Sequence, residues 1–63
     1  MPLIKVSMTP GRTEEQKRAL AEKVTDAFVE TCGGNREGIW VMIEEVPADH
    51  WATGGQLISD RTQ

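Results

Sequence analysis

The chain has 63 residues, a net charge of -3, one cysteine and one histidine. A chain of this size buries only about 60% of the surface that its unfolded form exposes, so a monomer would be marginally stable. The single cysteine excludes an internal disulfide, and one cysteine with one histidine excludes a metal cluster of such ligands. We therefore expect no metal, no cofactor and a stability that depends on self-association.

The acidic charge balance disfavours nucleic acid as a partner, because phosphate contacts need a basic surface. The apolar stretches are far shorter than the roughly 20 residues that span a bilayer, and no secretory leader follows the start. We therefore expect no membrane association and a cytoplasmic location.

The chain begins Met1-Pro2, and a methionine before so small a residue is normally removed. The mature chain would then begin at Pro2 with a free secondary amine, and a free α-amino group titrates near ~8. Such an amine can act as a base near neutral pH. The alternative is that Pro2 merely begins an edge strand, and these two residues do not decide between the two interpretations.

Residues 3–8 predict a strand, because Ile4, Val6 and Met8 alternate with Leu3, Lys5 and Ser7. The sequence TPGR then turns the chain. Residues 13–16, TEEQ, have the form of a capping box with two acids in the first turn, which indicates a helix start.

Apolar and small residues recur at helical spacing after this start and predict one packing face, formed by Leu20, Val24, Ala27, Phe28 and Thr31. The sequence CGGN, with Gly33 and Gly34, ends the helix. A second strand rich in β-branched residues starts at Ile39 with IWVMIEEV. We find no repeat or linker, so residues 1–63 are expected to form a single domain.

Strand, helix and strand in this order predict an α/β fold with one right-handed βαβ unit and two parallel strands. The tail DHWATGGQLISDRTQ predicts a short hairpin at Gly54-Gly55, with Trp51, Leu57 and Ile58 as apolar anchors that pack on a neighbouring chain. Two strands cannot cover the helix and also bury their other face. We therefore expect the sheets to be completed by oligomerisation.

Five motifs follow one another along the chain: Pro2 after Met1, GRTEEQKRAL, VTDAF, IEEV and DHWATGGQL. Together these motifs resemble the 4-oxalocrotonate tautomerase family over nearly the whole length. The resemblance implies a βαβ protomer, a homohexamer built as a trimer of dimers, and a cofactor-independent isomerase of aromatic catabolism. It also implies that the amino-terminal Pro2 is the general base.

The implied reaction converts enol or dienol forms of small-molecule 2-oxo acids into their keto forms. One base with a pKa near the working pH can take the proton from oxygen and return it to carbon. An apolar wall and the nearby cation of Arg12 would both disfavour the ammonium form of Pro2 and so lower its pKa.

The resemblance assigns substrate binding to Arg12, whose guanidinium can hold a carboxylate through two hydrogen bonds. The alternative is a solvated loop arginine that pairs with Glu14 or Glu15. Trp51 stands where the family has an aromatic residue that walls the site, although a tryptophan here can equally anchor an interface.

Trp40 is the main departure, because relatives that process the unsaturated dicarboxylate carry an arginine at this place. That arginine is supplied from a neighbouring subunit, where it polarises the 2-oxo group and holds the adjacent carboxylate, so activity on the family's namesake substrate is in doubt. Trp40 is expected either to line the substrate pocket or to pack against a subunit. Arg36 or Arg61 could supply the missing cation instead, but neither stands at the family position, and we expect solvated surface roles for both. For His50 we also expect a surface role.

Two other functions stay open from the sequence. The first is hydration or hydrolytic dehalogenation of unsaturated acids, which relatives perform with the proline protonated. This chemistry needs a carboxylate that activates water, and Glu44 and Glu45 are its candidates. The second is a non-catalytic oligomeric binding module on the same scaffold.

Overall fold

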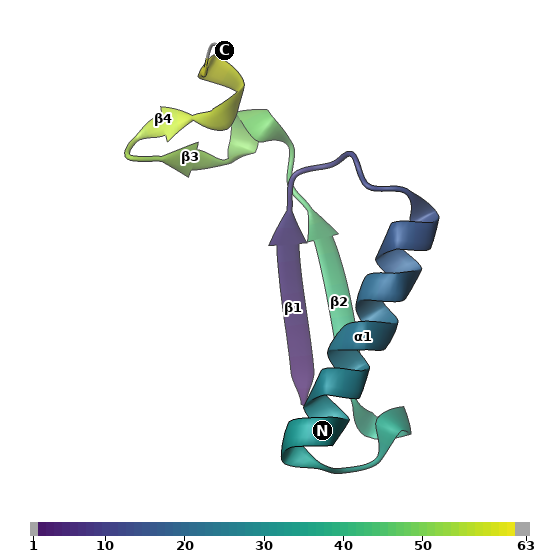
Figure 1. Cartoon of the computed structure of the whole chain (residues 1–63). Helices are drawn as coiled ribbons and strands as arrows, with labels where there is room; N and C mark the ends of the chain where they lie inside the picture. Colours follow the sequence, from purple (N-terminus) through teal and green to yellow (C-terminus); the bar gives the residue numbers. More distant parts are fainter. Residues whose placement is uncertain (1, 62–63) are drawn as a thin grey trace.

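The computed structural model describes residues 2–61 (Figure 1). Strand β1 (Leu3–Met8) leads into helix α1 (Glu14–Cys32), which returns antiparallel to the strand, and β2 (Trp40–Glu45) follows. A short hairpin of β3 (Ala52–Thr53) and β4 (Gln56–Leu57) completes the order. The expected α/β class, with one βαβ unit and a C-terminal hairpin, is confirmed.

Strands β1 and β2 pair in parallel, with a register that runs from Leu3↔Trp40 to Met8↔Glu45. Main-chain hydrogen bonds extend the pairing at both ends. At the amino end the Trp40 N–H donates to the Pro2 carbonyl at 3.0 Å, and at the carboxyl end the Val46 N–H donates to the Met8 carbonyl at 2.8 Å. This register fixes which side chains share each face of the sheet.

The capping box predicted at the start of α1 is present. The Thr13 hydroxyl accepts from the Gln16 N–H at 3.1 Å, and the Gln16 side-chain oxygen accepts from the Thr13 N–H at 2.9 Å. These bonds satisfy N–H groups that a helix start leaves without partners. At the other end Gly33 takes a φ of 77°, a value that favours glycine, and its N–H donates to the Val29 carbonyl at 2.9 Å.

Helix α1 covers one face of the sheet with Leu20, Val24 and Phe28, as predicted, and all three are half-buried. The prediction was wrong for Ala27 and Thr31, which are exposed. Ala27 lies at the side of the apolar stripe. Thr31 lies in the last turn, and a helix of 19 residues, about 28 Å long, extends past strands of six residues that span about 20 Å.

The opposite face of the sheet is uncovered. Leu3, Trp40 and Met42 lie on it with 54%, 56% and 48% of their surface exposed, and within residues 2–61 no residue is fully buried. The radius of gyration is 14.8 Å, against about 11 Å for a compact chain of this length. These features favour the expected completion of the sheet by other copies of the chain.

The C-terminal arm, residues 47–61, projects from the carboxyl end of β2 (Figure 1). Its hairpin pairs Ala52 with Leu57 and turns through Gly54 and Gly55, whose φ values of 61° and 86° suit a tight turn of the type with positive φ at both central residues. The Ile58 N–H donates to the Trp51 carbonyl at 2.7 Å and closes the arm on itself. Whether the arm packs on a neighbouring chain stays a prediction.

We expect light scattering at micromolar concentration to show a species several times the 7.0 kDa chain mass. Met42→Glu should dissociate this species and lower the free energy of unfolding, because it places a charge on the uncovered face. Ala27→Glu, on the exposed side of α1, is the matched control. A wild-type chain that is well folded and monomeric would contradict the prediction.

Candidate functional site

Pro2 lies at the amino end of β1, and it is half-buried. Its carbonyl belongs to the sheet through the bond from the Trp40 N–H. Its ring nitrogen is not a hydrogen-bond donor in any internal peptide, so the sheet makes no use of this atom. The fold therefore leaves the nitrogen of Pro2 available for chemistry once Met1 is removed, a step that lies outside the described residues.

Trp40 opens β2 beside Pro2. Leu3 is its register partner, and the exposed side chains of both residues lie on the uncovered face of the sheet. The indole is thus close to the amino end of β1, where it can form an apolar wall or pack against another chain. The single chain leaves both interpretations open.

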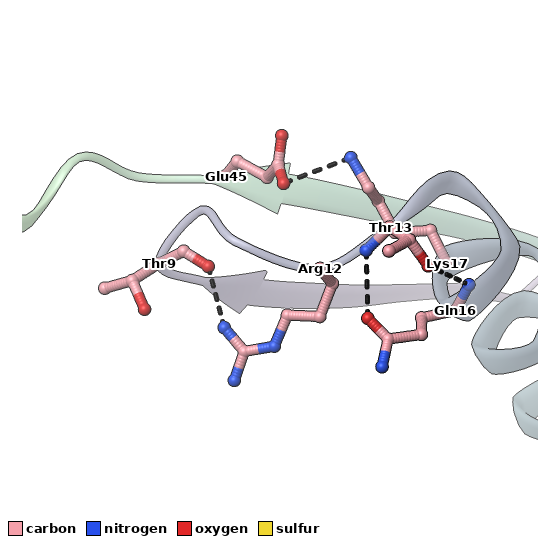
Figure 2. A network of polar contacts seen from close by, with 6 residues as sticks. All are labelled: Thr9, Arg12, Thr13, Gln16, Lys17 and Glu45. Carbon is pink, nitrogen blue, oxygen red and sulfur yellow. Dashed lines mark hydrogen bonds and ion pairs between the residues drawn. The ribbon is translucent and has the colours of Figure 1, made fainter.

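Arg12 lies in the loop of residues 9–13, which joins β1 to α1. Its Nη1 donates to the Thr9 carbonyl at 2.9 Å (Figure 2). Glu14, which the sequence offered as a partner, pairs instead with Arg18 at 3.1 Å, and within residues 2–61 no ion pair joins Arg12 to a carboxylate. The exposed guanidinium keeps other N–H donors free for an anion.

Trp51 is half-buried in the C-terminal arm, directly before β3, and so follows the carboxyl end of β2 in the chain. The four candidate residues therefore fall into two pairs, according to the end of the strands at which they lie. Pro2 and Trp40 lie at the amino ends of the strands, whereas Arg12 and Trp51 lie beyond their carboxyl ends (Figure 1). Six residues of strand separate the pairs by about 20 Å.

One chain therefore does not bring Pro2 and Arg12 together. A site that uses both residues needs contributions from at least two copies of the chain. The sequence contained a signal for this separation, because Pro2 and Arg12 flank a single predicted strand.

The two glutamates offered as water-activating groups are engaged in ion pairs. Glu44 Oε1 accepts from the Ser7 hydroxyl at 3.1 Å and lies 3.4 Å from Lys5 Nζ. Glu45 Oε2 lies 3.1 Å from Lys17 Nζ. Both carboxylates sit toward the carboxyl end of β2, away from Pro2 of the same chain.

Arg36 pairs with Asp26 and so ties the turn before β2 to α1. The Arg36 side chain is 48% exposed, in keeping with the surface role expected for it. His50 is exposed, and its Nε2 lies 3.9 Å from Asp49 Oδ1. Arg61 is also exposed, in keeping with the surface role expected for it.

Residues 2–61 contain no group of three His, Cys, Asp or Glu side chains that could hold a metal ion. Within the same range no helix is sufficiently long and apolar to cross a membrane.

Comparison with known sequences gives one consistent family. Residues 2–61 match the family model described as tautomerase enzyme. The chain is 56% identical over 61 residues to a probable tautomerase of Bacillus cereus, covering 97% of this chain and 100% of that protein. It is 53% identical over 60 residues to the 2-hydroxymuconate tautomerase of Bacillus subtilis, covering 95% and 97%.

Comparison with solved structures agrees. A crystal structure of a homologue of 4-oxalocrotonate tautomerase superposes with a TM-score of 0.93 at 51% identity, covering 97% of this chain and 100% of the other. The resemblance inferred from the motifs is thereby confirmed. The chain belongs to the tautomerase family, is a homologue of 4-oxalocrotonate tautomerase, and is an enzyme of the isomerase class.

Proposed function

We propose that the chain, after removal of Met1, converts enol or dienol forms of 2-oxo acids into their keto forms without a cofactor. One observation carries the proposal: Pro2 joins the sheet through its carbonyl alone, at 3.0 Å from the Trp40 N–H, and its nitrogen has no role in the fold. A cytoplasmic location and a place in aromatic catabolism belong to the same proposal.

Pro2 would move a single proton in this reaction. The ring nitrogen takes the proton from the enol hydroxyl while the carbonyl forms, and the resulting ammonium returns it to the carbon end of the former double bond. In the assembly, an apolar wall that includes Trp40 would disfavour the charged ammonium and keep more of the amine in its basic form. No further reactant is needed, because the proton is conserved.

Arg12 would bind the carboxylate of the substrate. A guanidinium presents its donors in a fixed, planar fork that matches a carboxylate, and the Thr9 carbonyl orients this fork in the free chain. Because Arg12 lies about 20 Å from Pro2 of its own chain, it would serve the Pro2 of another copy. This arrangement fits the proposed homohexamer, a trimer of dimers, with Trp51 as part of the apolar wall.

Trp40 would set the choice of substrate. Trp40 stands where dicarboxylate-processing relatives are expected to carry the arginine that a neighbouring subunit supplies, and Arg36 is held by Asp26. The site would therefore lack a cation for a second acidic group. We propose monocarboxylate enols with an aromatic group, such as phenylenolpyruvate, as better substrates than dicarboxylate dienols.

Pro2→Ala should lower kcat/KM for phenylenolpyruvate at least about tenfold, since general acid–base catalysis commonly contributes 10²- to 10⁴-fold and the primary amine of alanine retains part of it. Stopped-flow absorbance measures the rate, and intact mass verifies that Met1 is absent. Pro47→Ala, at the base of the C-terminal arm, is the matched control. Unchanged kinetics in the fully processed Pro2→Ala protein would refute the proton transfer.

Mixing of two variants with impaired activity tests the shared site. Pro2→Ala and Arg12→Ala chains, unfolded and refolded together, should recover activity, because some sites then combine an intact Pro2 from one chain with an intact Arg12 from another. Each variant refolded alone is the control. Activity that does not rise on mixing, in assemblies shown by mass spectrometry to be mixed, would contradict a site built from two chains.

Trp40→Arg should raise kcat/KM for the dicarboxylate 2-hydroxymuconate about tenfold, equivalent to about 1.4 kcal/mol of transition-state stabilisation. It should not raise kcat/KM for phenylenolpyruvate. Trp40→Leu separates loss of the indole from gain of the charge. The idea fails if wild type already processes the dicarboxylate as well as arginine-bearing relatives, or if the assembled Arg variant gains nothing.

A further inference from the structure

The ion pair between Lys17 and Glu45 joins the start of α1 to the end of β2. The two charged groups lie 3.1 Å apart, and their side chains are only 29% and 35% exposed. The neighbouring pair Arg18–Glu14 has the same distance, yet its side chains are 72% and 81% exposed. Water screens the attraction between Arg18 and Glu14 far more, so the Lys17–Glu45 pair holds its two elements together more strongly.

Lys17 is also the point where α1 first meets the sheet. The three helical residues before it, 14–16, are exposed, whereas Lys17 is half-buried. Its N–H donates to the Thr13 carbonyl at 3.1 Å and so closes the first helical turn. Lys17 thus connects the capped start of the helix to β2 through its side chain.

The loop that carries Arg12 is anchored next to this pair at both ends. At its start, the Met8 carbonyl accepts from the Val46 N–H at 2.8 Å, one residue beyond Glu45. At its end, Arg12 directly precedes Thr13, the capping residue whose helical turn Lys17 closes. Between these anchors, the Arg12 guanidinium donates to the Thr9 carbonyl at 2.9 Å.

We propose that Lys17 and Glu45 are positioning residues, which fix the loop of residues 9–13 so that Arg12 meets the substrate carboxylate. The inference rests on the role proposed above for Arg12. Figure 2 shows the Lys17 ammonium and the Arg12 guanidinium on opposite sides of the loop, so Lys17 acts through Arg12 and not by touching the same anion. A displacement of about 1 Å in a binding group is sufficient to weaken productive binding strongly.

The test measures KM and kcat for phenylenolpyruvate and for its methyl ester, which lacks the carboxylate charge. Lys17→Met and Glu45→Gln should each raise KM for the acid about fivefold, with kcat changed less than about twofold, as expected when only substrate binding is lost. The exchanged pair, Lys17→Glu with Glu45→Lys, should recover most of the affinity. Arg18→Met, which breaks the exposed pair on the same helical turn, is the matched control and should leave KM unchanged.

A double-mutant cycle separates positioning from direct binding. In an Arg12→Ala background, Lys17→Met should have no further effect on KM, and for the methyl ester neither change should matter. A Lys17→Met effect that persists in that background or with the ester overturns the proposal. Light scattering checks whether each variant assembles. If Lys17→Met does not assemble, the same measurements are made on Glu45→Gln, which keeps the side-chain volume.

The two proposals fail in different ways. If Arg12→Ala raises KM for the acid but Lys17→Met and Glu45→Gln do not, the positioning role is wrong and the carboxylate site stands. If Arg12→Ala leaves KM unchanged, the role of Arg12 is wrong, and the positioning role is wrong with it.

Discussion

One helix and two strands provide a single covered face, and this constraint governs the rest of the molecule. The parallel register places Val41 and Ile43 beneath α1 and leaves Trp40 and Met42 on the uncovered face. Apolar burial is the main favourable term in folding, and here the chain leaves three large apolar side chains exposed: Leu3, Trp40 and Met42. The proposed chemistry and the stability therefore depend on the same part of the molecule, because the exposed Leu3 and Trp40 lie at the end of the sheet where Pro2 begins β1.

The βαβ order, the capping box at Thr13 and the Gly54-Gly55 turn could be predicted from the sequence, because each depends on local spacing or on a backbone conformation that few residues adopt. Ala27 and Thr31 were misassigned for a tertiary reason. Ala27 is exposed because only a narrow face of the helix meets the sheet. Thr31 is exposed because α1 extends past the strands, and both facts depend on how the helix and the sheet pack.

The candidate site was harder to predict than the fold. The motifs pointed to Pro2, Arg12, Trp40 and Trp51 as separate residues, but a motif carries no distance between its members. The structure separates them into two pairs at opposite ends of β1. The sequence also gave no partner for Lys17 or Arg36, because each pairs with a carboxylate on another element, Glu45 and Asp26. Such pairs depend on the tertiary arrangement, which periodicity does not describe.

The bond between the Trp40 N–H and the Pro2 carbonyl is a main-chain contact, and it does not involve the indole. Any residue except proline can donate it. Position 40 can therefore exchange an aromatic, aliphatic or cationic side chain while the start of β1 keeps its place. Under the proposed mechanism, the fold thus separates the residue that must stay constant for proton transfer, Pro2, from the residue proposed to choose the substrate, so single substitutions at position 40 would give access to new substrates.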